Sequence, residues 1–395
     1  MGSTTETGLD EIRFNRPSLE GRELDYIRQA VGGGHTSSSG PFSARAAEVL
    51  REATDAREVL LTTSCTAALE LAAMLLACAP GDTVIVPSFT FTSTALAFAR
   101  EGARIKFCDI EPKTLGLDPA HLSDLLDDSV RAVIPVHYAG VACDMQGIYD
   151  ALADRPDVDI IEDNAHGLFG TWRGRPLGSL GRFSTLSFHE TKNFVCGEGG
   201  ALVINRDQDV DRARVLYDKG TNRRAFFLGQ VDKYSWKDTG SSFGLADTLA
   251  AYLYAQLERR EEILGKRRAV FDRYLRLLAP HADEYGYRVP VVPDDCEQAY
   301  HMFYVLLPDG ESRDRALSSM RGRGVYATFH YVPLHSSEGG QFFSAGSSAC
   351  PVTDDISARL LRLPFHNNLT PADAERVVAA FLEGLGSHVT PERPA

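Results

Sequence analysis

Lys192 is the first residue whose type and position suggest covalent chemistry. It follows the apolar stretch FSTLSFH and precedes the glycine-rich turn CGEGG. The chain has only seven lysines in 395 residues, so few other amines compete for such a role. An amine that loses its proton attacks an aldehyde and forms a Schiff base. Considered alone, however, Lys192 would be taken for a surface lysine.

Other polar or aromatic residues follow apolar stretches in the same way. Asp163 ends VDIIED, the SCT turn at 64–66 follows EVLLTT, and Phe91 lies in SFTFTST after TVIVP. Ligands of an open α/β sheet gather at the carboxyl ends of its strands, so we expect these side chains on one rim with Lys192. Taken singly, each also has a structural explanation: a helix cap, a loop hydrogen bond or a core aromatic.

Pyridoxal 5′-phosphate (PLP) is one cofactor that needs all of these residue types. Its aldehyde takes an amine, a carboxylate keeps its ring nitrogen protonated, a helix N-terminus holds its phosphate, and an aromatic ring packs on its face. Asp163 would stay ionised beside such a cationic ring. The combination therefore predicts a PLP site with Lys192 as anchor and general acid–base.

Motifs for other cofactors and partners are missing from the sequence. No G-x-G-x-x-G follows a strand, and there is no G-x-x-x-x-G-K-[ST] for a nucleoside triphosphate. No H-E-x-x-H or paired Cys/His spacing predicts a metal, and none is expected. The formal charge of −13 disfavours nucleic acid and anionic membranes as partners. Scattered cysteines, no long apolar run and no secretory signal predict a cytoplasmic protein.

The elements that must position these residues alternate between apolar runs and helical patterns over about 58–205. Fully apolar, β-branched strands separated by helices predict an α/β fold with a large, mostly parallel sheet covered by helices on both faces. A long helix over 246–278 is expected to lead into a smaller C-terminal α+β domain. The predicted domains are residues 1–260, with the N-terminal segment and the PLP site, and residues 261–395.

Two helix starts are also predicted from single residues. Ser18 is expected to cap a helix running through LEGRELDYIRQAV. Thr370 is expected to cap the last helix of the chain, with Pro371 in its first turn.

The longer strings resemble one known family. SFHETKN followed by GEGGAL, the upstream IIEDNAHG, and PSFTFTSTALAF are similar to the sugar aminotransferases of the DegT/DnrJ/StrS family, which have the fold-type-I PLP-dependent transferase architecture. The resemblance runs from about residue 12 to 385 through PVHYAGVACDM, DKGTNR, GQVDKY, HMFYVLL, FHYVPLH and RLLRLPF. These strings resemble in particular the subgroup of dTDP-4-amino-4,6-dideoxygalactose transaminases.

The resemblance implies roles around the cofactor ring. Lys192 matches the lysine that binds PLP covalently, Asp163 the partner of the pyridine nitrogen, and Phe91 the aromatic residue stacked on the ring. His166 falls where the family has Gln or His near the phenolic oxygen.

Further matches concern the cofactor phosphate. Cys65 and Thr66 match the phosphate-binding turn, and Ser187 matches a serine on the same phosphate. Many family members also supply an Asn from the neighbouring subunit. In GSSFGLAD of this chain Ser242 stands at that place, and its shorter side chain puts a direct contact in question.

The resemblance also implies a homodimer with shared active sites, L-glutamate as amino donor and a dTDP-linked keto-sugar as acceptor. An acidic protein needs a local basic cluster to hold a pyrophosphate, and a solvated charged loop is the alternative explanation of such a cluster. The substrate-binding candidates are Lys219, Thr221, Asn222, Arg223, Lys233 and Tyr234 for the nucleotide, and His330, Tyr331 and His335 for the sugar.

These features predict amino transfer to C4 of dTDP-4-dehydro-6-deoxy-D-glucose, which gives dTDP-4-amino-4,6-dideoxy-D-galactose. An equatorial C4 amine or a C3 amine is the nearest alternative. A sugar dehydratase is disfavoured, because the 3-dehydratases of the family have His where Lys192 stands. A non-catalytic PLP or sugar-nucleotide sensor would have no need of the intact Lys192, Asp163 and Ser187.

Overall fold

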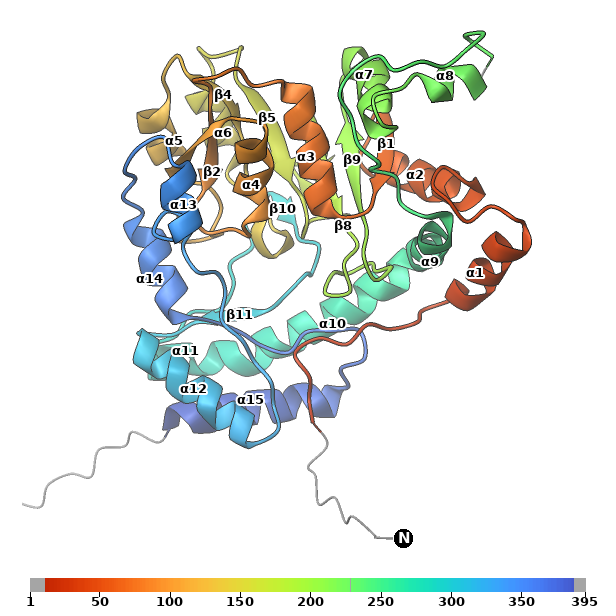
Figure 1. The fold of residues 1–395 in the computed structure, drawn as a ribbon. Coiled ribbons are helices and arrows are strands. Elements are labelled where there is room, and N and C mark those ends of the chain that lie inside the picture. Colours follow the sequence, from red (N-terminus) through yellow and green to blue (C-terminus); the bar gives the residue numbers. More distant parts are fainter. Residues whose placement is uncertain (1–10, 228, 387–395) are drawn as a thin grey trace, which may run out of the picture.

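A seven-stranded sheet forms the centre of the computed structural model, which describes residues 11–227 and 229–386 (Figure 1). The strand order is β1-β9-β8-β5-β4-β2-β3. β9 is antiparallel to both of its neighbours, and all other neighbouring pairs are parallel. The strands are β1 (Glu58–Thr62), β2 (Thr83–Pro87), β3 (Arg104–Cys108), β4 (Val130–Val133), β5 (Asp159–Asp163), β8 (Phe183–Ser187) and β9 (Gly200–Ile204). The predicted α/β fold with a mostly parallel sheet is confirmed.

Helices cover both faces of this sheet. Side chains alternate along a strand, so Val84 and Val86 of β2 join one buried cluster and Ile85 joins another. The first cluster is covered by α3 (Cys65–Leu76), α4 (Ser93–Arg100) and α7 (Asp207–Tyr217). The opposite side is covered by α2 (Pro41–Ala53), α5 (Pro119–Leu125), α6 (Met145–Ala151) and α9 (Asp247–Glu258). Burial on both faces explains why the strands are continuously apolar.

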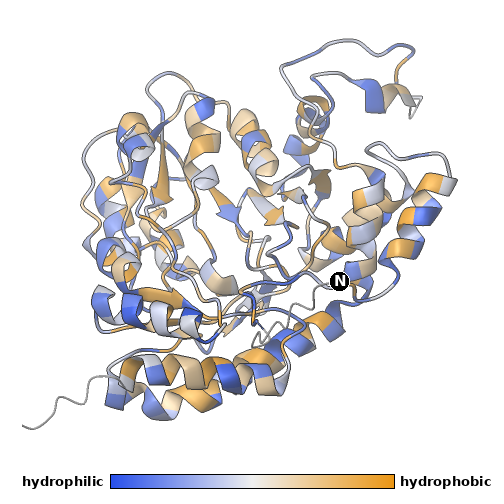
Figure 2. Cartoon of the chain, turned by 60° about the horizontal axis from the view of Figure 1, so that its bottom comes forward, coloured by the Kyte–Doolittle hydropathy of each residue, from blue (hydrophilic) through white to orange (hydrophobic). Residues whose placement is uncertain are grey.

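A second hydrophobic core lies in the C-terminal part of the chain. It is built from α10 (Arg260–Leu278), α12 (Gly310–Gly322), α15 (Pro371–Gly386) and the antiparallel pair β11 (Tyr304–Leu306) and β12 (Leu360–Arg362). In Figure 2 hydrophobic and hydrophilic residues alternate along the helices at the bottom of the molecule, as expected for helices with one buried face. Ile12 also joins this core and pairs with Val325. The domain boundary near residue 260 stays a prediction.

The single helix predicted over 246–278 is wrong, because the structure has two helices there. α9 ends at Glu258 and α10 begins at Arg260, with Arg259 between them at φ −103° and ψ 22°. α9 packs against α1 (Glu23–Gly32) and α2, whereas α10 packs against α15. The two halves bury their apolar faces against different cores, so the chain turns between them although its sequence pattern is helical throughout.

The predicted cap at Ser18 is also wrong. α1 begins only at Glu23, and the Ser18 hydroxyl donates to the Glu20 carboxylate at 2.5 Å. The Glu23 carboxylate accepts instead from two backbone N–H groups of the preceding turn, at 2.7 and 2.9 Å. The cap predicted at Thr370 is confirmed, since its hydroxyl accepts from the N–H of Asp373 at 3.1 Å.

The remaining elements are short. They are η1 (Tyr138–Gly140), β6 (Thr171–Trp172), β7 (Arg175–Pro176), α8 (Arg223–Phe227), η2 (Ala279–His281), α11 (Ala282–Tyr285), β10 (Cys296–Glu297), α13 (Glu338–Phe343) and α14 (Pro351–Arg359). Among the described residues, no helix has both the length and the apolar character needed to cross a membrane.

Candidate active site

A cavity of about 450 Å³ lies where the carboxyl ends of β1, β2, β5 and β8 meet β12 and the 330–331 segment. Every residue predicted to contact the cofactor lines it except Ser242, and so do two of the predicted sugar-binding residues. These lining residues are Cys65, Thr66, Phe91, Asp163, His166, Ser187, Lys192, His330 and Tyr331. The structure thus brings them together, and their individual roles stay predictions.

Asp163 is the last residue of β5, and its carboxylate is buried at the cavity wall. One oxygen accepts from the Thr94 hydroxyl at 2.7 Å, and the other from the backbone N–H of Ala165 at 3.3 Å. Burial raises the pKa of Asp163, while these two hydrogen bonds lower it. No ion pair within the described part of the chain uses this carboxylate, which leaves it able to pair with a cationic group of a ligand.

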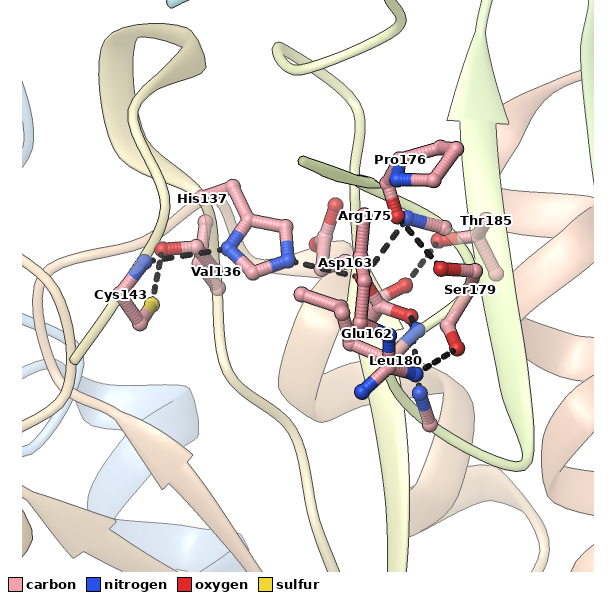
Figure 3. Close-up of polar contacts among 12 residues, drawn as sticks. Val136, His137, Cys143, Glu162, Asp163, Arg175, Pro176, Ser179, Leu180 and Thr185 are labelled. Atoms are coloured by element: carbon pink, nitrogen blue, oxygen red, sulfur yellow. Dashed lines mark hydrogen bonds and ion pairs between the residues drawn. The ribbon is translucent and has the colours of Figure 1, made fainter. Parts of the chain in front are cut away.

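Glu162 precedes Asp163 and points to the other side of the sheet, as alternation along a strand requires. Its carboxylate accepts from His137 Nε2 at 2.9 Å and from the backbone N–H groups of Gly178, Leu180 and Gly181 at 2.8, 2.7 and 2.9 Å (Figure 3). His137 in turn donates its backbone N–H to the Asp163 carbonyl at 3.3 Å. This largely buried network fixes the backbone that carries Asp163.

Lys192 lies beyond the end of β8 and lines the same cavity as Asp163. Its backbone N–H donates to the His189 carbonyl at 2.9 Å, which closes a turn. Burial in the cavity lowers the pKa of the Lys192 amine to about 8, although Cys65 and Asp163 nearby act to raise it. A lysine with this pKa presents a sizeable neutral fraction near pH 7, which nucleophilic attack on an aldehyde requires.

The turn at the start of α3 offers donors for a phosphate. Ser64 is the N-cap, and its hydroxyl accepts from the Ala67 N–H at 3.0 Å, so the capping explanation holds for this residue. Thr66 Oγ1 lies 2.8 Å from Ser93 Oγ. Burial raises the pKa of Cys65 to about 12, so it stays a neutral thiol. The uncompensated N–H groups of a first helical turn favour an anion here.

A glycine allows the turn to sit this close to the sheet. A Cβ on Gly200 would overlap the backbone of Ser64 and the backbone nitrogen of Cys65. Gly200 is the first residue of β9, and it is the last glycine of the CGEGG turn that was singled out from the sequence.

Two stacked histidines form another side of the cavity. The rings of His166 and His301 lie 4.1 Å apart at an interplanar angle of 14°, and His301 Nδ1 lies 3.0 Å from Asn193 Oδ1. Burial lowers the pKa of both imidazoles well below their ordinary value, so both are neutral near pH 7. His166 Nδ1 is buried with no hydrogen-bond partner in the described chain, and it is available to a ligand.

The predicted nucleotide-binding residues lie away from this cavity. Lys219, Arg223, Lys233 and Tyr234 belong to the 217–242 segment around α8, which projects from the body of the molecule (Figure 1). Ser242 lies there too, paired with Asp218. His335 is held outside the cavity by Ser88, whose hydroxyl lies 2.7 Å from His335 Nδ1. His335 therefore does not line this cavity, and its predicted contact with the sugar stays a prediction.

Sequence reasoning missed several lining residues, of which His301 and Arg362 stand out. His301 begins the apolar string HMFYVLL and Arg362 interrupts LLRLPF. A polar residue inside an apolar strand pattern is unusual, and that was the available signal. Which cavity such a residue enters depends on how the two cores are packed together.

These residues fit PLP. Asp163 is a buried carboxylate without an ion-pair partner among the described residues, the α3 turn can take a phosphate, and Lys192 is a shielded amine with a lowered pKa. Phe91 keeps 58% of its surface exposed, which leaves its ring free for a flat ligand. When bound, PLP supplies an electron sink for the loss of a proton from Cα of an amino acid.

Comparisons with known proteins agree with this geometry. The sequence profile of the DegT/DnrJ/EryC1/StrS aminotransferase family matches residues 17–382. GDP-perosamine synthase of Caulobacter vibrioides is 31% identical over 378 residues, which cover 94% of this chain and 98% of that protein. The aminotransferase TlmJ from Streptoalloteichus hindustanus is 29% identical, with a TM-score of 0.86 over 95% of this chain and 98% of its own.

A more distant structure shares the fold. Spr1654 from Streptococcus pneumoniae, solved in its PLP form, has 23% identity and a TM-score of 0.86, over 95% of this chain and 98% of its own. The family match over nearly the whole chain, the relative at 31% identity and the residues of the cavity lead to one conclusion. The chain belongs to the DegT/DnrJ/EryC1/StrS aminotransferase family and is a PLP-dependent sugar aminotransferase.

Proposed function

We propose that the protein transfers the amino group of L-glutamate to C4 of dTDP-4-dehydro-6-deoxy-D-glucose and so forms dTDP-4-amino-4,6-dideoxy-D-galactose. The observation that carries the amino transfer is the Lys192 amine in one cavity with the buried Asp163 carboxylate. The choice of sugar and of the axial amine rests on the strings DKGTNR, FHYVPLH and RLLRLPF, which resemble the enzymes of that product.

The side chains of the cavity have distinct roles in this proposal. Lys192 takes the proton from Cα of the donor in the first half-reaction and returns a proton to C4 of the sugar in the second. The face from which it delivers that proton decides between an axial and an equatorial amine. Asp163 stays ionised by pairing with the protonated ring nitrogen. His330 and Tyr331, on the opposite wall, contact the sugar.

The proposed active unit is a homodimer. Lys219, Arg223, Lys233 and Tyr234 lie outside the cavity of their own chain, on the projecting 217–242 segment. In a dimer this segment reaches the partner's cavity, where its basic residues hold the nucleotide diphosphate. Ser242 on the same segment takes the place of the family's asparagine and reaches the phosphate directly or through water.

A GDP-linked 4-keto-6-deoxy sugar is the second candidate acceptor. It is favoured by the relative at 31% identity, which is a GDP-perosamine synthase. An equatorial C4 amine or a C3 amine would be a different outcome of the same half-reactions.

The first experiment is the visible absorption of the PLP-loaded protein before and after L-glutamate, for the native chain and for Lys192→Ala. We expect glutamate to bleach the yellow band of the native protein, because Lys192 moves the Cα proton in this proposal, and we expect no such change in the variant. A protein that stays colourless with PLP would contradict Lys192 as anchor. A band that ignores glutamate would contradict the donor.

The acceptor is then identified with the glutamate-treated protein. We expect the dTDP-linked keto-sugar to restore the yellow band, and NMR of the product to show an axial C4 amine. If the GDP-linked sugar restored the yellow band and the dTDP-linked sugar did not, the acceptor would carry GDP, and the proposed nucleotide would be wrong. An equatorial amine in the product would contradict the proposed stereochemistry, and the proposed amino transfer would still hold.

A further inference from the structure

Arg362 is a cationic residue of the cavity to which the arguments above give no task. It is the last residue of β12, and its backbone N–H donates to the Thr328 carbonyl at 2.7 Å while its carbonyl accepts from the Thr328 N–H at 3.1 Å. The guanidinium lies over the ring of Phe14, 4.7 Å from its centre. Both Phe14 and Arg362 line the cavity.

The guanidinium of Arg362 has no acceptor in the described chain. Its Nε is buried with no hydrogen-bond partner, and no carboxylate forms an ion pair with it. Arg267, a buried arginine nearby, differs sharply, because it donates to the carbonyls of Tyr300 and His301 at 2.8 and 2.6 Å and to Asn367 at 3.1 Å. A shielded cation without an acceptor is costly, so a site that keeps one is expected to bind an anion.

The other charges of the cavity narrow the identity of that anion. Lys192 and Arg362 are the only lysine and arginine among the described residues that line it, and Lys192 is committed to the cofactor. His166, His301 and His330 are neutral, since burial lowers the pKa of each, and the charge of Arg362 adds to this in all three. Arg362 pairs with Thr328, two residues before His330, and so lies on the histidine side of the cavity, whereas the donors for the cofactor phosphate lie at the α3 turn.

The proposed donor and acceptor differ in the anion they bring. L-glutamate carries two carboxylates, while the sugar ring has none and its diphosphate is assigned to the 217–242 segment of a partner. A guanidinium binds a carboxylate with two parallel hydrogen bonds, and Phe14 holds the Arg362 plane in place.

We propose that Arg362 binds a carboxylate of the amino donor and so selects the substrate of the first half-reaction. This inference rests on the proposed function for the identity of the donor. It makes Arg362 a specificity residue that serves one half-reaction and is idle in the other.

The test uses the PLP-loaded protein with two substitutions. Arg362→Gln removes the charge, and Arg362→Lys keeps the charge but cannot form the two parallel hydrogen bonds of a guanidinium. Arg321→Gln is the matched control, because Arg321 is exposed and does not line the cavity. Calorimetry measures binding of maleate, an unreactive dicarboxylate, and the visible band measures the glutamate concentration needed for bleaching. We expect both apparent dissociation constants to rise about 10- to 100-fold in Arg362→Gln, less in Arg362→Lys, and not in the control.

Two further measurements test whether Arg362 binds a carboxylate of the donor, the cofactor phosphate or the diphosphate of the sugar nucleotide. PLP affinity and binding of the dTDP-linked sugar are expected to be unchanged in both Arg362 variants, with native melting temperatures as the check on folding. Loss of PLP binding, loss of sugar-nucleotide binding alone, or native-like maleate binding in the variants would overturn the proposal, as would a native protein that does not bind maleate.

The two proposals can fail separately. A native protein that binds maleate through Arg362 but is not bleached by glutamate would contradict the proposed donor and leave the carboxylate site standing. A native protein that glutamate bleaches equally well with and without Arg362 would keep the proposed function and remove the role of Arg362.

Discussion

The two walls of the cavity are built in different ways. On the sheet wall Asp163 accepts two hydrogen bonds from the protein and Ser64 caps α3, and behind this wall Glu162 accepts four hydrogen bonds that hold the backbone of β5. On the opposite wall Arg362 keeps a buried Nε without a partner in the described chain. The difference indicates that the sheet wall is already in place to hold the cofactor. The opposite wall leaves the Arg362 guanidinium as a hydrogen-bond donor for a substrate that binds and dissociates.

The largest effect expected on the sheet wall comes from Asp163→Asn. The substitution removes the negative charge that keeps the ring nitrogen protonated, so the rate of bleaching by glutamate should fall about 100- to 1,000-fold. Stopped-flow absorbance measures the rate. Asp127→Asn is the control, because that carboxylate pairs with Lys106 away from the cavity. A near-native bleaching rate in Asp163→Asn would show that the negative charge on the sheet wall is not needed for the reaction with glutamate.

The comparison of the two walls is sharpened by measuring how much one substitution near each wall changes the free energy of unfolding. Glu162→Gln places an NH₂ group among backbone donors and breaks a buried pair, so we expect a loss of about 3 kcal/mol in the free energy of unfolding. Arg362→Gln removes a cation that has no acceptor, and its effect should stay within about 1 kcal/mol. Urea unfolding of the cofactor-free proteins at one protein concentration measures both. Equal losses would remove the distinction between the walls.

A smaller, graded effect is expected from pH. Burial lowers the pKa of Lys192 to about 8, so the neutral amine that reacts with PLP dominates above pH 8 and falls about tenfold for each pH unit below it. The rate of PLP loading onto the cofactor-free protein should therefore rise from pH 6 and level off above pH 8. If the loading rate had its midpoint near the ordinary lysine pKa of about 10.4, burial in the cavity would not lower the pKa of Lys192.

Prediction from the sequence succeeds where short segments carry the information. The strands and the cap at Thr370 follow from apolar runs and capping chemistry, and the residues just beyond the strand ends were found for the same reason. The break at Arg259 was missed because a helical pattern does not show which core each half will bury against. The cap at Ser18 was predicted wrongly because α1 begins at Glu23 without a side-chain cap, and the contacts of the Glu23 carboxylate with the preceding turn do not show in the local pattern.

By itself, the sequence determined the fold class and the cofactor, and it predicted the group that anchors the cofactor, because residues next to parallel strand ends converge whatever the rest of the chain does. The resemblance of its longer strings determined the family. Only the tertiary structure decided that Glu162 turns away from the site while Asp163 faces it, that His335 is held by Ser88, and that Arg362 enters the cavity without a partner. Those facts depend on contacts between segments far apart in the chain, such as Ser88 with His335 at a separation of 247 residues, and no local pattern encodes which distant side chains will meet.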